Sequence, residues 1–216
     1  MVDSMDNKAE EQGEGLKTSG EPSVRAPRRV RADAQRNIDS LLQSAMQVFA
    51  VSGVDAPVRE IAEKAGVGIG TVYRHFPERS DLIVAVFRHE VDACAAAAAT
   101  LASEYEPGEA LSRWMQRYVD FIAAKRGLAA ALHSGNPAFD VLPAYFQKHL
   151  RPALQNLLDA AAAEGKVRTD VDPDDLLMAV ASLSSFSAPG DSQGDQKRRM
   201  IALLMDGLRY NATAPQ

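Results

Sequence analysis

The sequence predicts an all-α protein of roughly nine helices. After residue 36, apolar residues recur at three- and four-residue spacing, which is the period of one helix face. Runs that alternate polar and apolar residues are too short to predict strands. Capping residues, glycines and prolines divide the pattern into segments of helical length. With 216 residues, of which 46% are hydrophobic, the chain is long enough to bury a sizeable core.

Composition excludes several classes of protein. The single cysteine, Cys94, rules out an internal disulfide and a multi-cysteine zinc site, and we expect it to be a small buried hydrophobic residue. No apolar run approaches the roughly 20 residues that cross a bilayer. The first residues are polar and acidic, unlike a signal peptide, so we expect the protein in the cytoplasm. A formal net charge of -5 argues against binding of polyanions by overall charge alone.

Residues 1–30 are predicted to form a polar N-terminal arm with a basic end. Residues 1–24 are rich in Gly, Glu, Ser and Lys and nearly free of apolar residues, which predicts disorder. Between Arg25 and Arg36 stand five arginines and only one acidic residue, Asp33. Such an arm either contacts phosphates or a DNA minor groove, or is a solvated tail.

The first predicted helix starts after Arg36 and ends at Ser52-Gly53, because glycine is common just past a helix end. Two short helices joined by a glycine turn follow, over Pro57–Ala65 and Ile69–Phe76. We expect Gly66 to supply a left-handed backbone conformation at the turn. This spacing is typical of a helix-turn-helix, whose second helix enters the major groove of DNA.

We expect two helical domains. The helix-turn-helix domain covers residues 31–79, and a larger helical domain covers residues 80–216. Ser80 and Asp81 predict the start of a long helix that runs to about Ser103. We interpret Asp172 as the N-cap of a helix with Pro173 in its first turn, rather than as a metal ligand. The other predicted helices are Pro107–Arg126, Gly127–His133, Phe139–Glu164 as one or two helices, Pro173–Ser185 and Asp195–Tyr210.

Residues 61–77, IAEKAGVGIGTVYRHFP, followed by Asp81-Leu82, closely resemble the signature of the TetR family of bacterial transcriptional regulators. The resemblance is strong over residues 36–87. The later segments GEAL, KRGLAAAL and EGKVRTDVDPDDLL are similar, more loosely, to one C-terminal variety of that family. The resemblance implies a homodimer that binds a palindromic operator in double-stranded DNA, and we expect it to respond to a small-molecule effector. From the residues themselves we expect no enzymatic activity and no metal or cofactor.

The resemblance also assigns DNA contacts. Arg36 at the expected start of the first helix and Arg79, where the family usually has lysine, are candidate phosphate contacts. Val58 stands where many members have threonine. The predicted DNA-binding residues are Arg36, Arg59, Ile69, Gly70, Thr71, Tyr73, Arg74, His75 and Arg79.

Aromatic residues of the C-terminal domain have two interpretations, core packing or the lining of an effector pocket. Phe87 and Val91 would form the floor of that pocket, and a histidine would supply a polar point. The predicted ligand-binding residues are Phe87, Val91, Trp114, Tyr118, Phe121, His133, Tyr145 and His149.

Apolar residues on the last two helices are either core or, as the resemblance implies, the seam of a four-helix bundle formed with a second copy of the chain. They are Leu176, Leu177, Val180, Leu183, Phe186, Met200, Leu203, Leu204, Met205 and Leu208.

We therefore expect a repressor that a small-molecule effector releases from its operator. The alternatives are an activator, and a helical ligand-binding or structural protein with a vestigial DNA-binding domain. The glycines at 66, 68 and 70 do not form a dinucleotide loop, because Tyr73 stands where the fingerprint needs glycine and no strand precedes them. The four histidines lack zinc spacing, and no Gly-x-Ser-x-Gly nucleophile motif is present.

Overall fold

The computed structural model of the protein describes residues 27–185, 193–210 and 212. Over these residues the chain forms nine α-helices, two short 3-10 helices and no strand, which confirms the all-α prediction. None of the described helices combines the length and apolar character needed to cross a membrane. The elements are α1 (Pro27–Ser52), α2 (Val58–Ala65), α3 (Ile69–His75), α4 (Arg79–Glu104), α5 (Pro107–Lys125), η1 (Arg126–Leu128), α6 (Ala129–Leu132), η2 (Pro137–Phe139), α7 (Leu142–Ala163), α8 (Pro173–Ser185) and α9 (Gln193–Arg209).

Helix α1 begins earlier than the apolar pattern indicates. We expected its start after Arg36, whereas it begins at Pro27, and this prediction was wrong. Proline suits a first helical turn, since its ring fixes φ near the helical value and it lacks an N–H that would have no partner there. Arg36 therefore lies inside α1, and the last residues of the expected arm belong to the helix. The disorder expected for residues 1–24 concerns residues outside the described part of the chain.

Helices α2 and α3 form the predicted helix-turn-helix. Gly66 at the turn has φ 68° in the left-handed region, as expected from its sequence position. A Cβ there would meet nothing within 4 Å, so the backbone conformation alone favours glycine. Ile61 and Ala62 of α2 and Val72 of α3 are buried, and they attach both helices to the core under α1.

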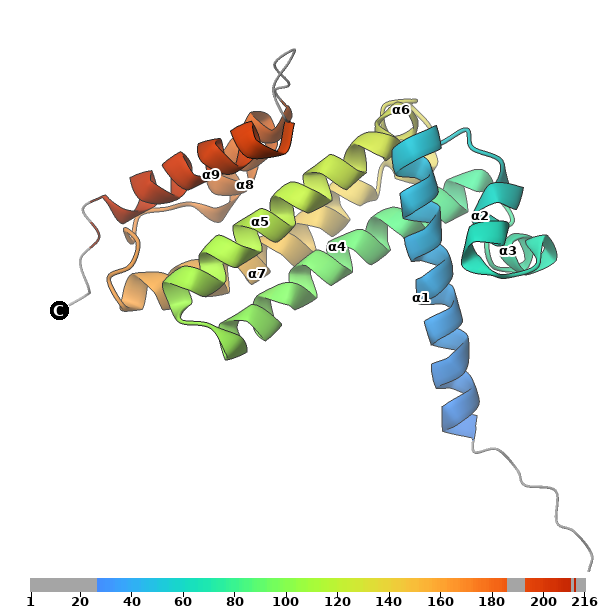
Figure 1. Cartoon of the computed structure of the whole chain (residues 1–216), viewed down its shortest axis with the longest axis horizontal. Coiled ribbons are helices and arrows are strands. Elements are labelled where there is room, and N and C mark those ends of the chain that lie inside the picture. Colours follow the sequence, from blue (N-terminus) through green and yellow to red (C-terminus); the bar gives the residue numbers. More distant parts are fainter. Residues whose placement is uncertain (1–26, 186–192, 211, 213–216) are drawn as a thin grey trace, which may run out of the picture.

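Helix α4 joins the two parts of the molecule (Figure 1). It starts at Arg79 with Glu78 as its N-cap, one position before the predicted start. The backbone N–H of Glu78 donates to Asp81 Oδ2 at 3.0 Å, which completes a reciprocal capping box. The first half of α4 packs on α1, and the helix continues alongside α5 and α7.

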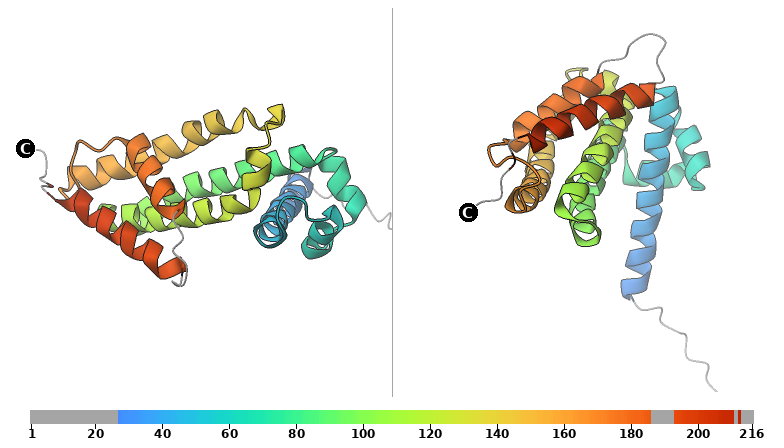
Figure 2. Two further views of the ribbon diagram at one scale, coloured as in Figure 1. Left: turned by 90° about the horizontal axis from the view of Figure 1, so that it is seen from above. Right: turned by 60° about the vertical axis from the view of Figure 1, so that its left-hand side comes forward.

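The C-terminal part is a bundle of α4, α5 and α7, with α8 and α9 at the end of the molecule away from α2 and α3 (Figures 1 and 2). Trp114 and Tyr118 of α5 are fully buried at its centre. Helix α7 is continuous, although Pro152 lies inside it. Asp172 accepts hydrogen bonds from the backbone N–H groups of Asp174 (2.7 Å) and Asp175 (3.2 Å), which confirms its predicted role as a helix cap.

Candidate DNA-binding surface and ligand cavity

Helix α3 exposes two large side chains that a packed helix would normally bury. Ile69 is 42% exposed and Tyr73 is 51% exposed, while Val72 between them anchors the helix to the core. A Cβ at Gly70 would meet nothing within 4 Å, so this part of the helix can approach another surface closely. Arg74 and His75 are exposed at the end of the helix, and Thr71 is partly exposed.

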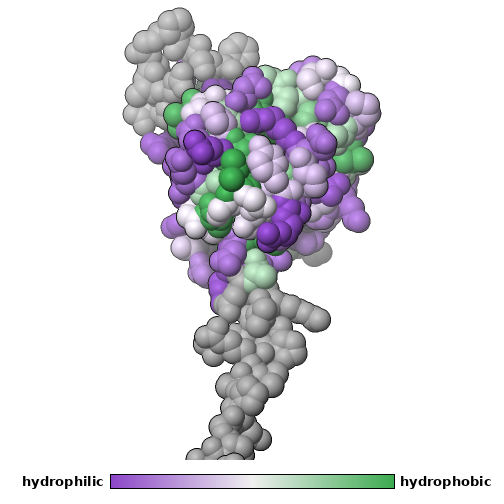
Figure 3. All heavy atoms as spheres, turned by 90° about the vertical axis from the view of Figure 1, so that its right-hand side faces the viewer, coloured by the Kyte–Doolittle hydropathy of each residue, from purple (hydrophilic) through white to green (hydrophobic). Residues whose placement is uncertain are grey.

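Figure 3 shows the end of the molecule on which α2 and α3 lie. Hydrophilic residues dominate this face and surround a small apolar patch. A hollow of about 410 Å³ lies beside α3, and Arg59, Ile69, Tyr73 and Arg79 are among the residues that border it. The structure thus brings four of the predicted DNA-binding residues to one place, with an exposed arginine from α2 next to the exposed side chains of α3.

Arg79 has a structural role that the sequence did not reveal. Its guanidinium donates hydrogen bonds to the backbone carbonyl oxygens of Val54 and Ala56, in the loop that leads into α2. These contacts hold the helix-turn-helix against the start of α4. These bonds use two of the five N–H groups of the guanidinium, and the phosphate contact predicted for this residue stays a prediction. Arg36 lies on the exposed side of α1, well inside the helix.

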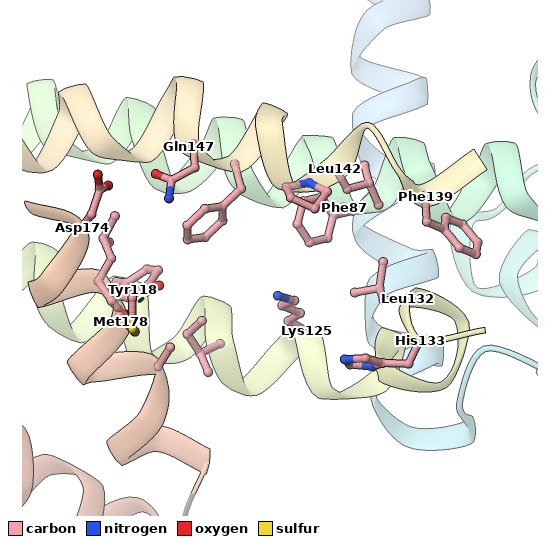
Figure 4. Close-up of a pocket in the computed structure, with 15 residues that line it drawn as sticks. Phe87, Tyr118, Lys125, Leu132, His133, Phe139, Leu142, Gln147, Asp174 and Met178 are labelled. Carbon is pink, nitrogen blue, oxygen red and sulfur yellow. Dashed lines mark hydrogen bonds between the residues drawn. The ribbon is translucent and has the colours of Figure 1, made fainter. Parts of the chain in front are cut away.

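A cavity of about 440 Å³, partly open to solvent, lies in the C-terminal bundle, between side chains of α4, α5, α7 and α8 and the segment after α5 (Figure 4). Phe87, Tyr118 and His133, three of the predicted ligand residues, line it. Apolar and aromatic side chains form most of its wall. The polar groups are Lys125, Gln147 and Asp174, which sequence reasoning missed.

The other predicted ligand residues do not line the cavity. Val91, Trp114 and Phe121 are buried in the bundle core, so core packing is the interpretation that holds for them. Tyr145 and His149 lie outside the lining. Their rings stack with centroids 4.0 Å apart, and the Tyr145 hydroxyl donates to Asp92 at 2.7 Å.

Lys125, at the end of α5, is the most unusual group of the cavity. Its ammonium Nζ lies 5.7 Å from the ring centroid of Phe87 and 6.0 Å from that of Phe146. Burial lowers the pKa of Lys125, because the surroundings disfavour its charged form. No sequence pattern indicates this placement, since a lysine in the last turn of a helix is ordinarily a solvated residue.

Two more polar groups at the cavity are tied to the backbone. The Tyr118 hydroxyl donates to the carbonyl oxygen of Leu177 at 3.3 Å, and burial raises the pKa of this phenol. His133 Nδ1 lies 2.7 Å from the carbonyl oxygen of Ala129. A carbonyl oxygen only accepts, so Nδ1 carries the proton of that hydrogen bond. Within the described part of the chain, no cluster of His, Cys, Asp or Glu is arranged to hold a metal ion.

Two family models match this chain, one in its N-terminal part and one in its C-terminal part. Residues 41–86 match the family model of bacterial regulatory proteins of the tetR family. Residues 106–210 match the model of the C-terminal domain of SbtR-like transcriptional regulators. These families consist of transcriptional regulators, which are not enzymes.

Solved structures and curated relatives agree with this assignment. The TetR transcriptional regulator SCO0520 from Streptomyces coelicolor is 39% identical with a TM-score of 0.70, over 79% of this chain and 97% of that chain. A TetR regulatory protein from Mycobacterium vanbaalenii is 37% identical with a TM-score of 0.65, over 83% of this chain and 99% of that chain. The HTH-type transcriptional regulator SAUSA300_2515 of Staphylococcus aureus is 36% identical over 64 residues, which are 29% of this chain and 35% of that protein. The match thus spans about a third of the length of the curated relatives. Given its two family matches and its likeness to SCO0520 over nearly the whole of that chain, this protein belongs to the TetR family of bacterial regulatory proteins.

Proposed function

We propose that the protein is a homodimeric transcriptional repressor, which binds a palindromic DNA operator and leaves it when a small molecule occupies the cavity. The exposed face of α3 carries this proposal. Ile69 and Tyr73, 42% and 51% exposed, belong to a seven-residue helix that follows a glycine turn. Such a helix is the part of a helix-turn-helix that enters the major groove.

The exposed residues divide into two kinds of DNA contact. Ile69, Gly70 and Thr71 occupy the start of α3, where small or apolar groups can approach base edges and thymine methyl groups. Arg59, Arg74 and His75 are exposed around them, and their donors suit phosphate oxygens. The acidic net charge of the whole chain does not oppose this, because charge near the contact surface governs phosphate binding.

Helices α8 and α9 are the proposed dimer interface, and the effector domain is the part from residue 80 onward. Five of the ten predicted interface residues are buried within the monomer, namely Leu176, Leu177, Val180, Met205 and Leu208. Leu203 is 74% exposed, and together with Leu183, Met200 and Leu204 it borders a hollow of about 450 Å³. A second copy of the chain would cover these residues in a four-helix bundle. Phe186 lies outside the described residues.

Two structural elements, α4 and η1, connect the cavity to the DNA-binding domain. Phe87 of the cavity wall belongs to α4, whose first residue, Arg79, holds the loop before α2. The segment after α5, which contains His133 of the cavity wall, packs through η1 on α1. A ligand that binds one arrangement of these helices better shifts the spacing of the two recognition helices, with a coupling free energy typically of about 1–3 kcal/mol.

Selection from randomised double-stranded oligonucleotides tests the proposal. We expect enrichment of an inverted repeat whose half-sites lie about one helical turn apart or slightly more, ~34–36 Å in the simplest case. Footprinting on the selected site then defines the contacted phosphates, and transcription in vitro distinguishes repression from activation. An absence of sequence preference at moderate salt, without effector, would identify the DNA-binding domain as vestigial.

A further inference from the structure

Lys125 brings a positive charge without an ion-pair partner among the described residues to a cavity whose walls are mostly apolar. Its ammonium group contacts the ring faces of Phe87 and Phe146. Among the described residues, no carboxylate forms an ion pair with it, and burial is the cause of its lowered pKa. A partly buried ammonium group has lost hydration, which ring faces replace only in part. An anion next to Nζ would restore that lost stabilisation.

The acidic group at the cavity has a cationic partner of its own. Asp174 Oδ2 accepts a hydrogen bond from Arg151 Nε at 3.0 Å, and the same guanidinium lies 4.0 Å from Asp172 Oδ2, so Arg151 compensates the charge of Asp174 in part. Figure 4 places Asp174 with Gln147 toward one end of the cavity and His133 toward the other, with Lys125 between them. Asp174 thus has an ion-pair partner, whereas Lys125 has none among the described residues.

We propose that the cavity binds an apolar carboxylic acid, whose carboxylate pairs with Lys125 Nζ and whose hydrocarbon part packs against the aromatic and aliphatic walls. This inference rests on the proposed effector role of the cavity. The volume of about 440 Å³ is that of a small-molecule site. Sugars and nucleotides do not fit walls such as Phe87, Leu142 and Phe146, because their many polar groups would lose hydrogen bonds to water there.

Three probes with one skeleton separate charge from shape: 4-phenylbutanoate, 4-phenylbutanamide and 4-phenylbutylamine. Trp114 is the only tryptophan, and its ring stacks on Tyr118 of the cavity wall with centroids 5.7 Å apart. Its emission on excitation at the red edge of tryptophan absorption therefore reports occupancy, and calorimetry gives the affinities. We expect the acid to bind about 10- to 100-fold more tightly than the amide, as for a hydrogen bond to a charged group. The amine should bind most weakly.

Variants at Lys125 test the assignment of the charge. Lys125→Met keeps the length and apolar body of the side chain, so the affinity for the acid should fall to that for the amide, while the amide binds as before. Lys125→Arg keeps the charge and should keep the preference for the acid. Lys148→Met is the matched control, since Lys148 is an exposed lysine of α7 outside the cavity lining. Thermal melts show whether each variant is folded.

The inference is overturned if the amide or the amine binds as tightly as the acid, if Lys125→Met keeps the preference, or if none of the probes binds at millimolar concentration. These measurements use the free protein, so they do not depend on an operator. The proposed function fails separately, if the acid binds through Lys125 but leaves operator affinity unchanged, or if the protein selects no DNA sequence.

Discussion

Gly127 lies directly against the backbone of Phe49, so closely that a Cβ at residue 127 would stand 2.5 Å from the Phe49 carbonyl oxygen and 2.9 Å from the Cα of Ala50. Phe49 is near the end of α1, and Gly127 is in η1, two residues after Lys125 of the cavity. The contact joins the effector domain to the DNA-binding domain through main-chain atoms. It has no flexible side chain that could move aside.

Gly127→Ala should therefore destabilise the protein, because the new methyl group forces η1 and α1 apart. The expected loss is about 1–3 kcal/mol, the usual cost of overpacking, measured by urea unfolding. Gly70→Ala is the matched control for stability, since its Cβ meets nothing within 4 Å, and alanine inside a helix is favourable by roughly 0.5–1 kcal/mol over glycine. Equal stability of Gly127→Ala and the wild type would show that the two helices separate freely at this contact.

Tyr73→Ala should abolish tight operator binding while the protein remains folded. Tyr73 is half exposed on α3, so its loss removes little core packing, while the DNA contact costs about 1–3 kcal/mol or more. Gel shifts on the selected operator measure affinity, and circular dichroism melts measure folding. Tight binding by a folded Tyr73→Ala protein would remove this residue from the DNA surface.

Arg74 and Arg79 are close in sequence but should behave in opposite ways. Arg74→Ala should lower the salt dependence of operator binding by the contribution of about one phosphate contact, without changing the melting temperature. Arg79→Ala should lower the melting temperature, because the carbonyl oxygens of Val54 and Ala56 lose their donor. Titrations at several salt concentrations and thermal melts separate the two effects. A reduced salt slope with unchanged stability in Arg79→Ala would instead support the phosphate role predicted from the sequence.

The helix-turn-helix could be predicted from the sequence, but the role of Arg79 in it and the position of Lys125 could not. The spacing of Ala62, Gly66 and Val72 fixed the helix-turn-helix, because local backbone and packing rules leave few alternatives there. The role of Arg79 depends on carbonyl groups more than twenty residues away, which no local pattern encodes. Lys125 likewise looks like an ordinary helix-end lysine until the fold brings Phe87 and Phe146 to it.

Leu203→Arg should convert the proposed dimer into folded monomers. The side chain is largely exposed in the monomer and borders the hollow between α8 and α9, so a charge there opposes association and not folding. Light scattering and sedimentation measure the mass. Ala202→Arg is the matched control, since Ala202 is exposed on the same helix but does not border the hollow. An intact Leu203→Arg dimer would place the interface elsewhere.

Cys94 should be inert to thiol reagents in the native protein and should couple folding to alkaline pH. Burial raises the pKa of its thiol from 9.0 to about 12, nearby Glu90 adds to the rise, and Arg117 opposes it. Between these two values the unfolded chain loses the thiol proton while the folded chain keeps it, so the free energy of unfolding falls as pH rises from about 9 toward 12. Below pH 9 this contribution is constant. Urea unfolding at several pH values should therefore show a smaller loss of unfolding free energy at alkaline pH in Cys94→Ala than in the wild type.

Thiol labelling is a second test. It is unambiguous because the chain has one cysteine, and it should need denaturant to proceed. Rapid native labelling at pH 8, or identical alkaline slopes in the two proteins, would mean that water reaches the thiol between α4 and α5.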